Sequence, residues 1–428
     1  MGQTTEQITE TVRLTRLANG VRVMTDNMPG LGTVSVGIWV ATGARFEPDS
    51  LNGAAHMLEH MVFKGTQKRS AVQIASDIEA VGGQMNAYTT RDTTAFYVRL
   101  LSQDLPLSVD VLSDLLLTPV LDPGELDRER QVIIQEIGMT EDTPDDLIHD
   151  LFQTCAYPGQ ALGRPILGSR ETVSTISRDA LQEYLARNYS AGRLVIAAAG
   201  DVDHDDFVAL VAKRFESRES HAGYQMAQAD YQGGDLRRDD DLEQVHVMLG
   251  FDAVGPKDDR FQTAHVLSNL LGGGMSSRLF QEVREKRGLV YSVYSFLNPS
   301  VDSGLLSIYA GTGPDQVAEL IAVICDELQK LADDVTEEEI ARAKAQARAG
   351  QMLALENSMM RAEFWANNML TFDQAILPET VIAEIDAVDL AGVKTLSRDI
   401  MASPLTLTAL GRLKGLEDYD RIQARLAA

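Results

Sequence analysis

The pattern of apolar and polar positions predicts short strands alternating with helices along the chain. Strands are expected where apolar residues alternate with polar ones, or where β-branched and aromatic residues gather: 12–17, 21–26, 33–40, 88–101 and 194–199. Asn19-Gly20 is typical of a hairpin turn between the first two strands. Helices are expected where apolar residues recur at helical spacing: 53–64, 70–81, and a long helix from Asp122-Pro123, where Asp122 and Glu125 match a capping box.

Segments of the second half repeat segments of the first at nearly constant spacing. Leu185–Gly200 aligns with Leu396–Gly411 at an offset of 211 residues, and Ala55–His60 aligns with Ala264–Asn269 at an offset of 209. Two matches at nearly equal offsets favour duplication of one α+β domain, in which a mixed β-sheet has flanking helices. The polar stretch 216–240 is typical of a linker. We therefore expect an N-terminal domain over 1–215 and a C-terminal domain over 241–428.

A run of five residues in the first predicted helix, 53–64, has the spacing of a metal site: His56-Met-Leu-Glu-His60. His56 and His60 are four residues apart, so both imidazoles project from one face of a helix and can reach one ion. Glu59 lies beside the expected position of a zinc-bound water, from which it could take a proton. This is the HxxEH order, the inverse of HExxH. The alternative is an amphipathic helix whose polar residues merely face solvent.

The second half carries a degenerate copy of this run. His265 is in register with His56, but Ser268 and Asn269 stand where Glu59 and His60 would be. The second half is therefore not expected to hold the same metal.

A third protein ligand must come from another segment. Glu129 and Glu136 are seven residues apart on the long helix after Asp122, so they share a helix face. They are candidates for the site. The alternative is a solvated charged helix, which the other charges of this segment also fit.

Composition excludes several classes of function. The 428-residue chain has a formal net charge of −25 and a pI near 4.6, which argues against nucleic acid as a partner and favours basic partners. Cys155 and Cys325 lie far apart and outside any CxxC motif, so we expect free thiols in a reducing compartment, the cytoplasm. Met1–Gly20 lacks the apolar region of a secretory signal, and no stretch is apolar enough to span a membrane.

Several separated motifs together resemble one family. They are Gly53-Ala-Ala-His-Met-Leu-Glu-His60, Asn86-Ala-Tyr-Thr89, Glu129–Glu136, Gly163-Arg-Pro-Ile-Leu-Gly168, and Leu271-Gly-Gly-Gly-Met-Ser-Ser-Arg-Leu-Phe280. The chain resembles, over nearly its whole length, the pitrilysin-type zinc peptidases, and among them the group of the mitochondrial processing peptidase beta subunit and its bacterial relatives. The resemblance implies a zinc metalloendopeptidase built as a clam-shell chamber from two homologous domains. The first would be catalytic and the second, without metal, a substrate clamp.

The resemblance also implies roles for residues of the first domain. His56, His60 and Glu136 match ligands of one Zn2+ ion per chain, Glu59 matches the general base, and Glu129 matches an acid that supports the site.

Further residues match substrate contacts in the family. Asn86 and Ala87 lie on a strand whose edge would pair with the substrate backbone, and Phe63 matches a pocket for the residue after the cut. Asp146 and Asp150 match acids that receive an arginine before the cut; the alternative is a solvated helix start.

Arg284 and Tyr291, seven residues apart, match a pair that holds the substrate and stabilises the developing oxyanion. The alternative is a surface helix with a solvated arginine.

The glycine run at 272–274 lacks the Gly-Lys-Ser/Thr ending of a phosphate loop, so nucleotide binding is rejected. One chain carries this run, the zinc motif and the Arg284/Tyr291 pair, which favours a homodimer. The resemblance implies cleavage of peptides or unfolded, presequence-like segments, and the acidic net charge predicts a preference for basic ones. The rival hypothesis is a non-catalytic scaffold, or a partner subunit of a processing or respiratory complex.

Overall fold

The chain folds into two compact units, which are described here from a computed structural model covering residues 2–427. The first unit contains the described residues up to Gly138, with Arg164–Ala227 and Leu353–Ile376. The second contains Met139–Gly163, Gln228–Met352 and the described residues from Leu377 onward. The units thus depart from the predicted continuous domains in two segments, 139–163 and 353–376. Each of these segments carries a helix that packs on the sheet of the unit it joins.

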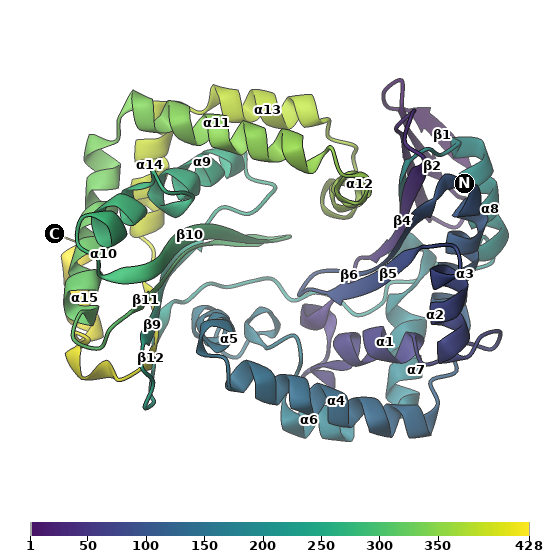
Figure 1. The fold of residues 1–428 in the computed structure, drawn as a ribbon, viewed down its shortest axis with the longest axis horizontal. Helices are drawn as coiled ribbons and strands as arrows, with labels where there is room; N and C mark the ends of the chain where they lie inside the picture. Colours follow the sequence, from purple (N-terminus) through teal and green to yellow (C-terminus); the bar gives the residue numbers. More distant parts are fainter. Residues whose placement is uncertain (1, 428) are drawn as a thin grey trace. The chain divides into compact units, whose positions relative to one another are not determined.

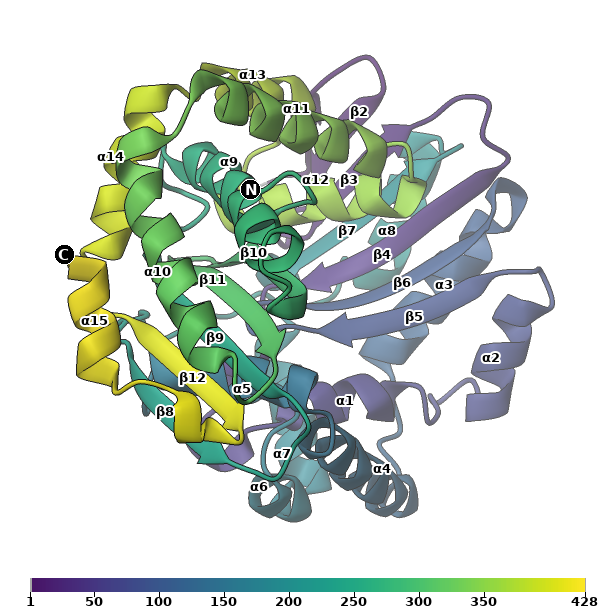
Figure 2. The same ribbon diagram turned by 60° about the vertical axis from the view of Figure 1, so that its left-hand side comes forward.

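The first unit is built on a mixed sheet with strand order β1-β2-β3-β7-β4-β6-β5 (Figure 1). Its strands are β1 (Thr4–Gln7), β2 (Val12–Arg16), β3 (Arg22–Asn27), β4 (Thr33–Val40), β5 (Gln84–Thr89), β6 (Thr94–Leu101) and β7 (Leu194–Gly200). Strand β7 runs parallel to β3 and antiparallel to β4. Strand β5 forms one edge of the sheet (Figure 2).

Helices cover both faces of this sheet. They are α1 (Ala54–Val62), α2 (Ala71–Glu79), α3 (Leu105–Leu117), α4 (Pro123–Glu141), α6 (Arg170–Thr175), α7 (Arg178–Asn188), α8 (His204–Phe215) and α12 (Ser358–Phe372). Side chains alternate along β4, so Val36 and Ile38 enter the core with α1, α3, α7 and α8. Ser35 instead faces α12, where its hydroxyl lies 2.8 Å from that of Ser358.

The second unit contains a sheet with strand order β10-β11-β9-β12-β8. Its strands are β8 (Gly234–Asp239), β9 (Val245–Ala253), β10 (Val290–Ser300), β11 (Ser303–Thr312) and β12 (Thr406–Gly411). Its helices are α5 (Pro144–Ala156), α9 (Phe261–Gly272), α10 (Val317–Asp334), α11 (Glu337–Ala354), α13 (Pro378–Ala387), α14 (Leu390–Met401) and α15 (Tyr419–Ala427), and a short π-helical segment spans Phe280–Glu285.

The two sheets share one topology, which confirms the predicted duplicated α+β fold. The order β3-β7-β4-β6-β5 in the first corresponds to β8-β12-β9-β11-β10 in the second, with the same parallel and antiparallel pairs. Gly200 and Gly411, which the sequence repeat aligns, have φ of +129° and +124°. A Cβ atom would lie 2.3 Å from the Thr33 carbonyl oxygen at Gly200 and 2.5 Å from that of Gln244 at Gly411. Both positions therefore require glycine for the same reason.

Two predicted elements differ in the structure. The single strand predicted over 88–101 is a hairpin, β5 and β6, because the backbone turns at Thr90 and its N–H donates to the Thr93 carbonyl at 2.7 Å. The predicted linker 216–240 ends in β8, whose polar residues pair in parallel with β12. The turn at Asn19-Gly20 and the cap at Asp122, whose carboxylate accepts the N–H groups of Gly124 and Glu125, are confirmed.

Candidate metal centre

Helix α1 presents two different faces. Met57, Leu58 and Met61 are fully buried and fix the helix to the core of the first unit. His56, Glu59 and His60 lie on the other side and are only partly buried. The helical spacing of three apolar anchors therefore leaves three chemically active side chains at a surface.

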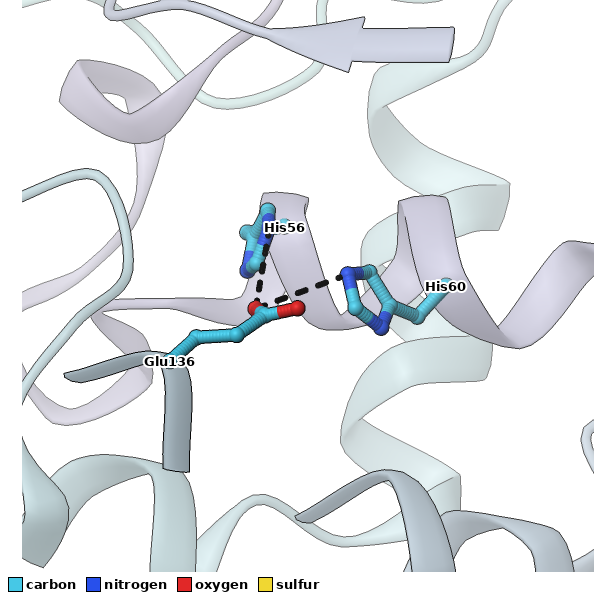
Figure 3. Close-up of side chains that lie close together, drawn as sticks. All are labelled: His56, His60 and Glu136. Carbon is cyan, nitrogen blue, oxygen red and sulfur yellow. Dashed lines mark ion pairs between the residues drawn. The ribbon is translucent and has the colours of Figure 1, made fainter. Parts of the chain in front are cut away.

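Two imidazoles and one carboxylate converge beside this surface (Figure 3). The Nε2 atoms of His56 and His60 each lie 3.8 Å from Oε2 of Glu136, which comes from α4. The imidazole rings are 4.6 Å apart at 62° to each other. Among residues 2–427 this is the one group of three metal-capable side chains whose ligand atoms all lie within 4.8 Å of one another. Ligands about 2.0–2.2 Å from a tetrahedral zinc are separated by roughly 3.3–3.6 Å, so the three side chains fit that ion with small movements.

The protonation state of His56 is also compatible with metal binding. Burial, and the neighbouring His60, lower the pKa of His56 to about 4. Its ring is therefore neutral at pH 7 and has a nitrogen lone pair to offer. Nδ1 of His56 is buried and has no hydrogen-bond partner in the described part of the chain.

His60 is oriented by a second acid of α4. Glu129 is 5% exposed, and its Oε2 lies 3.0 Å from Nδ1 of His60 while its Oε1 lies 2.7 Å from the Lys64 ammonium. When Nδ1–H donates to Glu129, the lone pair of His60 is left on Nε2, which faces Glu136. The predicted pair, Glu129 and Glu136, thus lies two helical turns apart on α4, and each side chain faces a different ring nitrogen of His60.

Glu59 lies on the same helix as His56 and His60, near the charges of His60 and Glu136. The hydroxyl of Thr89, the last residue of β5, donates to Oε2 of Glu59 at 2.6 Å. Burial raises the pKa of Glu59, the hydroxyl contact lowers it, and the net shift is upward. A carboxylate with a raised pKa accepts and returns a proton more readily at neutral pH.

The predicted substrate residues of the first unit lie on β5 and at the end of α1, two elements that are in contact. Phe63 directly follows α1, with its ring 6.2 Å from that of Phe96. Within residues 2–427, β5 pairs with β6 alone, so its other edge is unpaired. Asn86 is exposed on β5, and its side-chain oxygen accepts the backbone N–H of Ala87 at 2.8 Å.

The remaining predicted residues belong to the second unit. Asp146 and Asp150 lie one turn apart on α5. The guanidinium of Arg284 lies over two rings, 4.8 Å from the centre of Phe280 and 5.0 Å from that of Tyr291. Tyr291 is 78% exposed. The structure therefore brings Arg284 and Tyr291 together, and the predicted roles of all four residues stay predictions.

The copy of the motif in the second unit contains one histidine, His265, which packs against an aromatic ring. His265 on α9 packs edge-on against Phe261 with ring centres 4.8 Å apart, and burial lowers its pKa. Sequence reasoning missed Thr89 and Lys64, which contact Glu59 and Glu129. Thr89, at the end of β5, contacts α1, and Lys64, just after α1, contacts α4. These are tertiary contacts, which the spacing of residues along the sequence does not predict.

Comparisons with known proteins identify the family of this chain. Residues 22–170 match the family model described as insulinase (peptidase family M16), and residues 175–347 match the peptidase M16 inactive domain. An uncharacterized zinc protease of Streptomyces coelicolor is 40% identical over 94% of this chain and 90% of its own length. One of Bacillus subtilis is 38% identical over 92% of this chain and 96% of its own length.

Solved structures show a similar fold. A protease from Helicobacter pylori matches with a TM-score of 0.88 and 22% identity over 94% of this chain and 99% of that one. A chain of complex III2 from Candida albicans matches with a TM-score of 0.85 and 21% identity over 96% and 99%. No helix within residues 2–427 has the length and apolar character needed to cross a membrane.

Proposed function

The chain belongs to peptidase family M16 and is a zinc metallopeptidase, and from this premise we propose that it is an endopeptidase whose zinc is held by His56, His60 and Glu136. The observation that carries the proposal is the convergence of three ligand atoms from α1 and α4 within 4.8 Å. Two imidazoles and one carboxylate form the donor set of a catalytic zinc that leaves one position open.

Bound zinc would supply a Lewis acid that polarises the scissile carbonyl and makes water acidic enough to be deprotonated at neutral pH. The protein supplies the proton transfer. Glu59 takes a proton on its carboxylate and returns it to the leaving amine, with the Thr89 hydroxyl fixing one of its oxygens. Glu129 holds His60 in the tautomer that presents Nε2.

The substrate would bind as an extended peptide on the free edge of β5. Backbone pairing with Asn86 and Ala87 would bind an extended peptide through its main chain, with little selectivity for its side chains. The Ala87 N–H, which now donates to the Asn86 side chain, would turn to the substrate. Phe63 would contact the residue after the cut.

Residues of the second unit would set the preference for substrates. We assign an arginine of the substrate to Asp146 and Asp150, and the holding of the peptide and its developing oxyanion to Arg284 and Tyr291. The net charge of −25 favours basic peptides, through an attraction that salt would screen. The proposal includes unfolded or presequence-like segments as substrates and a homodimer as the working form.

A cytoplasmic location is part of the proposal, because both cysteines are buried free thiols. The alternative function is a non-catalytic scaffold or partner subunit. One specific observation supports it, the similarity of fold to a chain of complex III2 from Candida albicans. The intact His56–His60 run and its carboxylate on α4 favour the enzyme.

The test is cleavage of an unbiased library of unstructured peptides by the purified chain. We expect cleavage that a chelator stops and that stoichiometric zinc restores. Cleavage that appears only after a second protein is added would identify a subunit that needs a partner. A chain that binds no zinc and cleaves no peptide would be a scaffold.

A further inference from the structure

The start of the metal-binding helix α1 lacks a cap of its own. The N-cap position is Gly53, which has φ of +97° and no side chain to accept the free N–H groups of the first turn. The first turns of most helices need such an acceptor, because their N–H groups have no partner inside the helix. His56 is the third residue of this helix, so any displacement of the first turn moves a metal ligand.

Glu47 supplies the missing acceptor from the preceding loop. Its Oε2 accepts the N–H of Gly53 at 2.9 Å, and its Oε1 accepts the N–H of Ala55 at 2.6 Å. The side-chain amide of Asn52 also donates to Oε2 at 3.0 Å. All three groups are donors, so they suit an ionised carboxylate. The side chain is 4% exposed, so water does not compete for these hydrogen bonds.

The motif Gly163-Arg-Pro-Ile-Leu-Gly168, to which the proposed chemistry assigns no task, holds this loop. Arg164 donates to the Glu47 carbonyl at 2.6 Å and pairs with the Asp49 carboxylate. The Pro165 carbonyl accepts from the Asn52 amide at 3.0 Å.

The end of the motif packs directly against the backbone before α1. Gly168 has φ of +78°, and a Cβ there would lie 2.5 Å from the Asn52 carbonyl oxygen. A Cβ on Gly53 would lie 2.8 Å from the Leu167 carbonyl oxygen. Two glycines are therefore needed for the motif to reach the start of the helix.

We propose that Glu47 is a positioning residue for the zinc centre, and that the Arg164–Gly168 segment fixes Glu47 so that the first turn of α1 presents His56 at the position that zinc binding requires. The inference rests on the proposed function, in which His56, His60 and Glu136 hold the metal. Glu47 contacts neither metal nor substrate; it acts through the backbone of α1.

The chain offers a matched control for a buried carboxylate. Asp26, in β3 of the same unit, is 2% exposed and accepts from the Arg361 guanidinium at 3.1 Å and the Trp365 indole at 2.9 Å. Asp26→Asn and Glu47→Gln make the same chemical change at two buried, hydrogen-bonded carboxylates. Only Glu47 contacts α1.

The test measures zinc affinity by chelator competition on folded protein, with circular dichroism and urea unfolding of the zinc-free form alongside. We expect Glu47→Gln to weaken zinc binding by about tenfold or more, the range seen when groups that orient ligands are removed. Asp26→Asn should lose stability and keep zinc affinity within about twofold of the wild type. Equal zinc affinity in the wild type and Glu47→Gln would overturn the inference.

Two further proteins keep the result decisive. If Glu47→Gln does not fold, Arg164→Gln replaces it, because that change loosens the Glu47 backbone and leaves the carboxylate in place. A weakening of zinc binding by Arg164→Gln supports the inference, and an unchanged affinity overturns it. His60→Ala tests the premise: if it binds zinc as the wild type does, or if the wild type binds none, the proposed metal site is wrong. The inference alone fails when the wild type binds zinc, His60→Ala does not, and Glu47→Gln binds as the wild type.

Discussion

Nδ1 of His60 lies 3.0 Å from Oε2 of Glu129, while the other ring nitrogen of His60 faces Oε2 of Glu136 at 3.8 Å. One histidine is thus held between two carboxylates of one helix, seven residues apart. Glu129 is buried and also contacts the Lys64 ammonium, whereas Glu136 is partly exposed. The buried acid is placed to orient the ring, and the accessible acid to bind an ion beside it.

Replacing Glu129 with glutamine should weaken zinc binding by about 10- to 100-fold, because the amide no longer fixes the His60 tautomer with a charged acceptor. Chelator competition at constant pH measures the change. Glu125→Gln is the control, since Glu125 lies one turn earlier on α4 and its carboxylate pairs with the Arg128 guanidinium instead of a histidine. Equal zinc affinity in both variants would contradict the role of Glu129.

His204 should contribute to the pH dependence of the free energy of unfolding. Its two ring nitrogens lie 2.7 Å from the hydroxyls of Thr15 and Thr25, and burial lowers the pKa of His204 to about 4. The unfolded chain takes up this proton near pH 6.5, and the folded chain only near pH 4. The unfolded state therefore binds more protons in this window, and the free energy of unfolding falls as the pH is lowered from 6.5 to 4.

Urea unfolding of the zinc-free protein across this range measures the effect. His204 should contribute about 2 to 3 kcal/mol of the fall, and His204→Gln should remove that share. His221→Gln is the control, because His221 is exposed. A pH dependence unchanged by His204→Gln would show that the ring is not kept neutral by the fold.

The attachment of α12 to the first unit should depend on Asp26. This carboxylate accepts from two residues of α12, Arg361 and Trp365, far away in sequence. Asp26→Asn leaves the buried donors poorly paired and should cost about 1 to 3 kcal/mol in the free energy of unfolding. Tryptophan fluorescence during urea unfolding follows the change, because Trp365 is one of the two tryptophans of the chain. An unchanged midpoint would contradict the assignment of α12 to this unit.

Substrate preference offers a test of Asp146. Asp146→Asn should lower kcat/KM for peptides with an arginine before the cut by about tenfold, because a charge-assisted hydrogen bond is lost. Matched peptides with glutamine in place of that arginine should be cleaved as by the wild type. Asp142→Asn, at a nearby exposed position, is the control. An equal fall in kcat/KM for the arginine and the glutamine peptides would contradict the proposed contact between Asp146 and the arginine.

The local parts of this fold were open to prediction from sequence, and the reason lies in short-range physics. The spacing of His56 and His60 places them on one helix face whatever surrounds that helix. The glycine that ends each repeat, Gly200 or Gly411, marks a positive φ in both copies. The sequence repeat therefore predicted a shared topology that the two sheets have.

The parts that escaped prediction depend on tertiary contacts. Residues 88–101 are rich in β-branched and aromatic side chains on both sides of Arg91-Asp92, so this short polar break did not outweigh the strand pattern and the turn at Thr90 was missed. Strand β8 is polar and is a strand because β12 pairs with it. Glu47 caps α1 across the loop that separates it from Gly53 and Ala55, and no periodic pattern in the sequence predicts this contact.

The most direct test of the central claim is to measure zinc content and peptide cleavage together on Glu59→Gln. The account predicts one zinc per chain, bound as tightly as in the wild type, with cleavage reduced by about 10²- to 10⁴-fold, because the ligands remain and the proton acceptor is gone. A Glu59→Gln protein that still cleaves at the wild-type rate with its zinc bound would contradict the account.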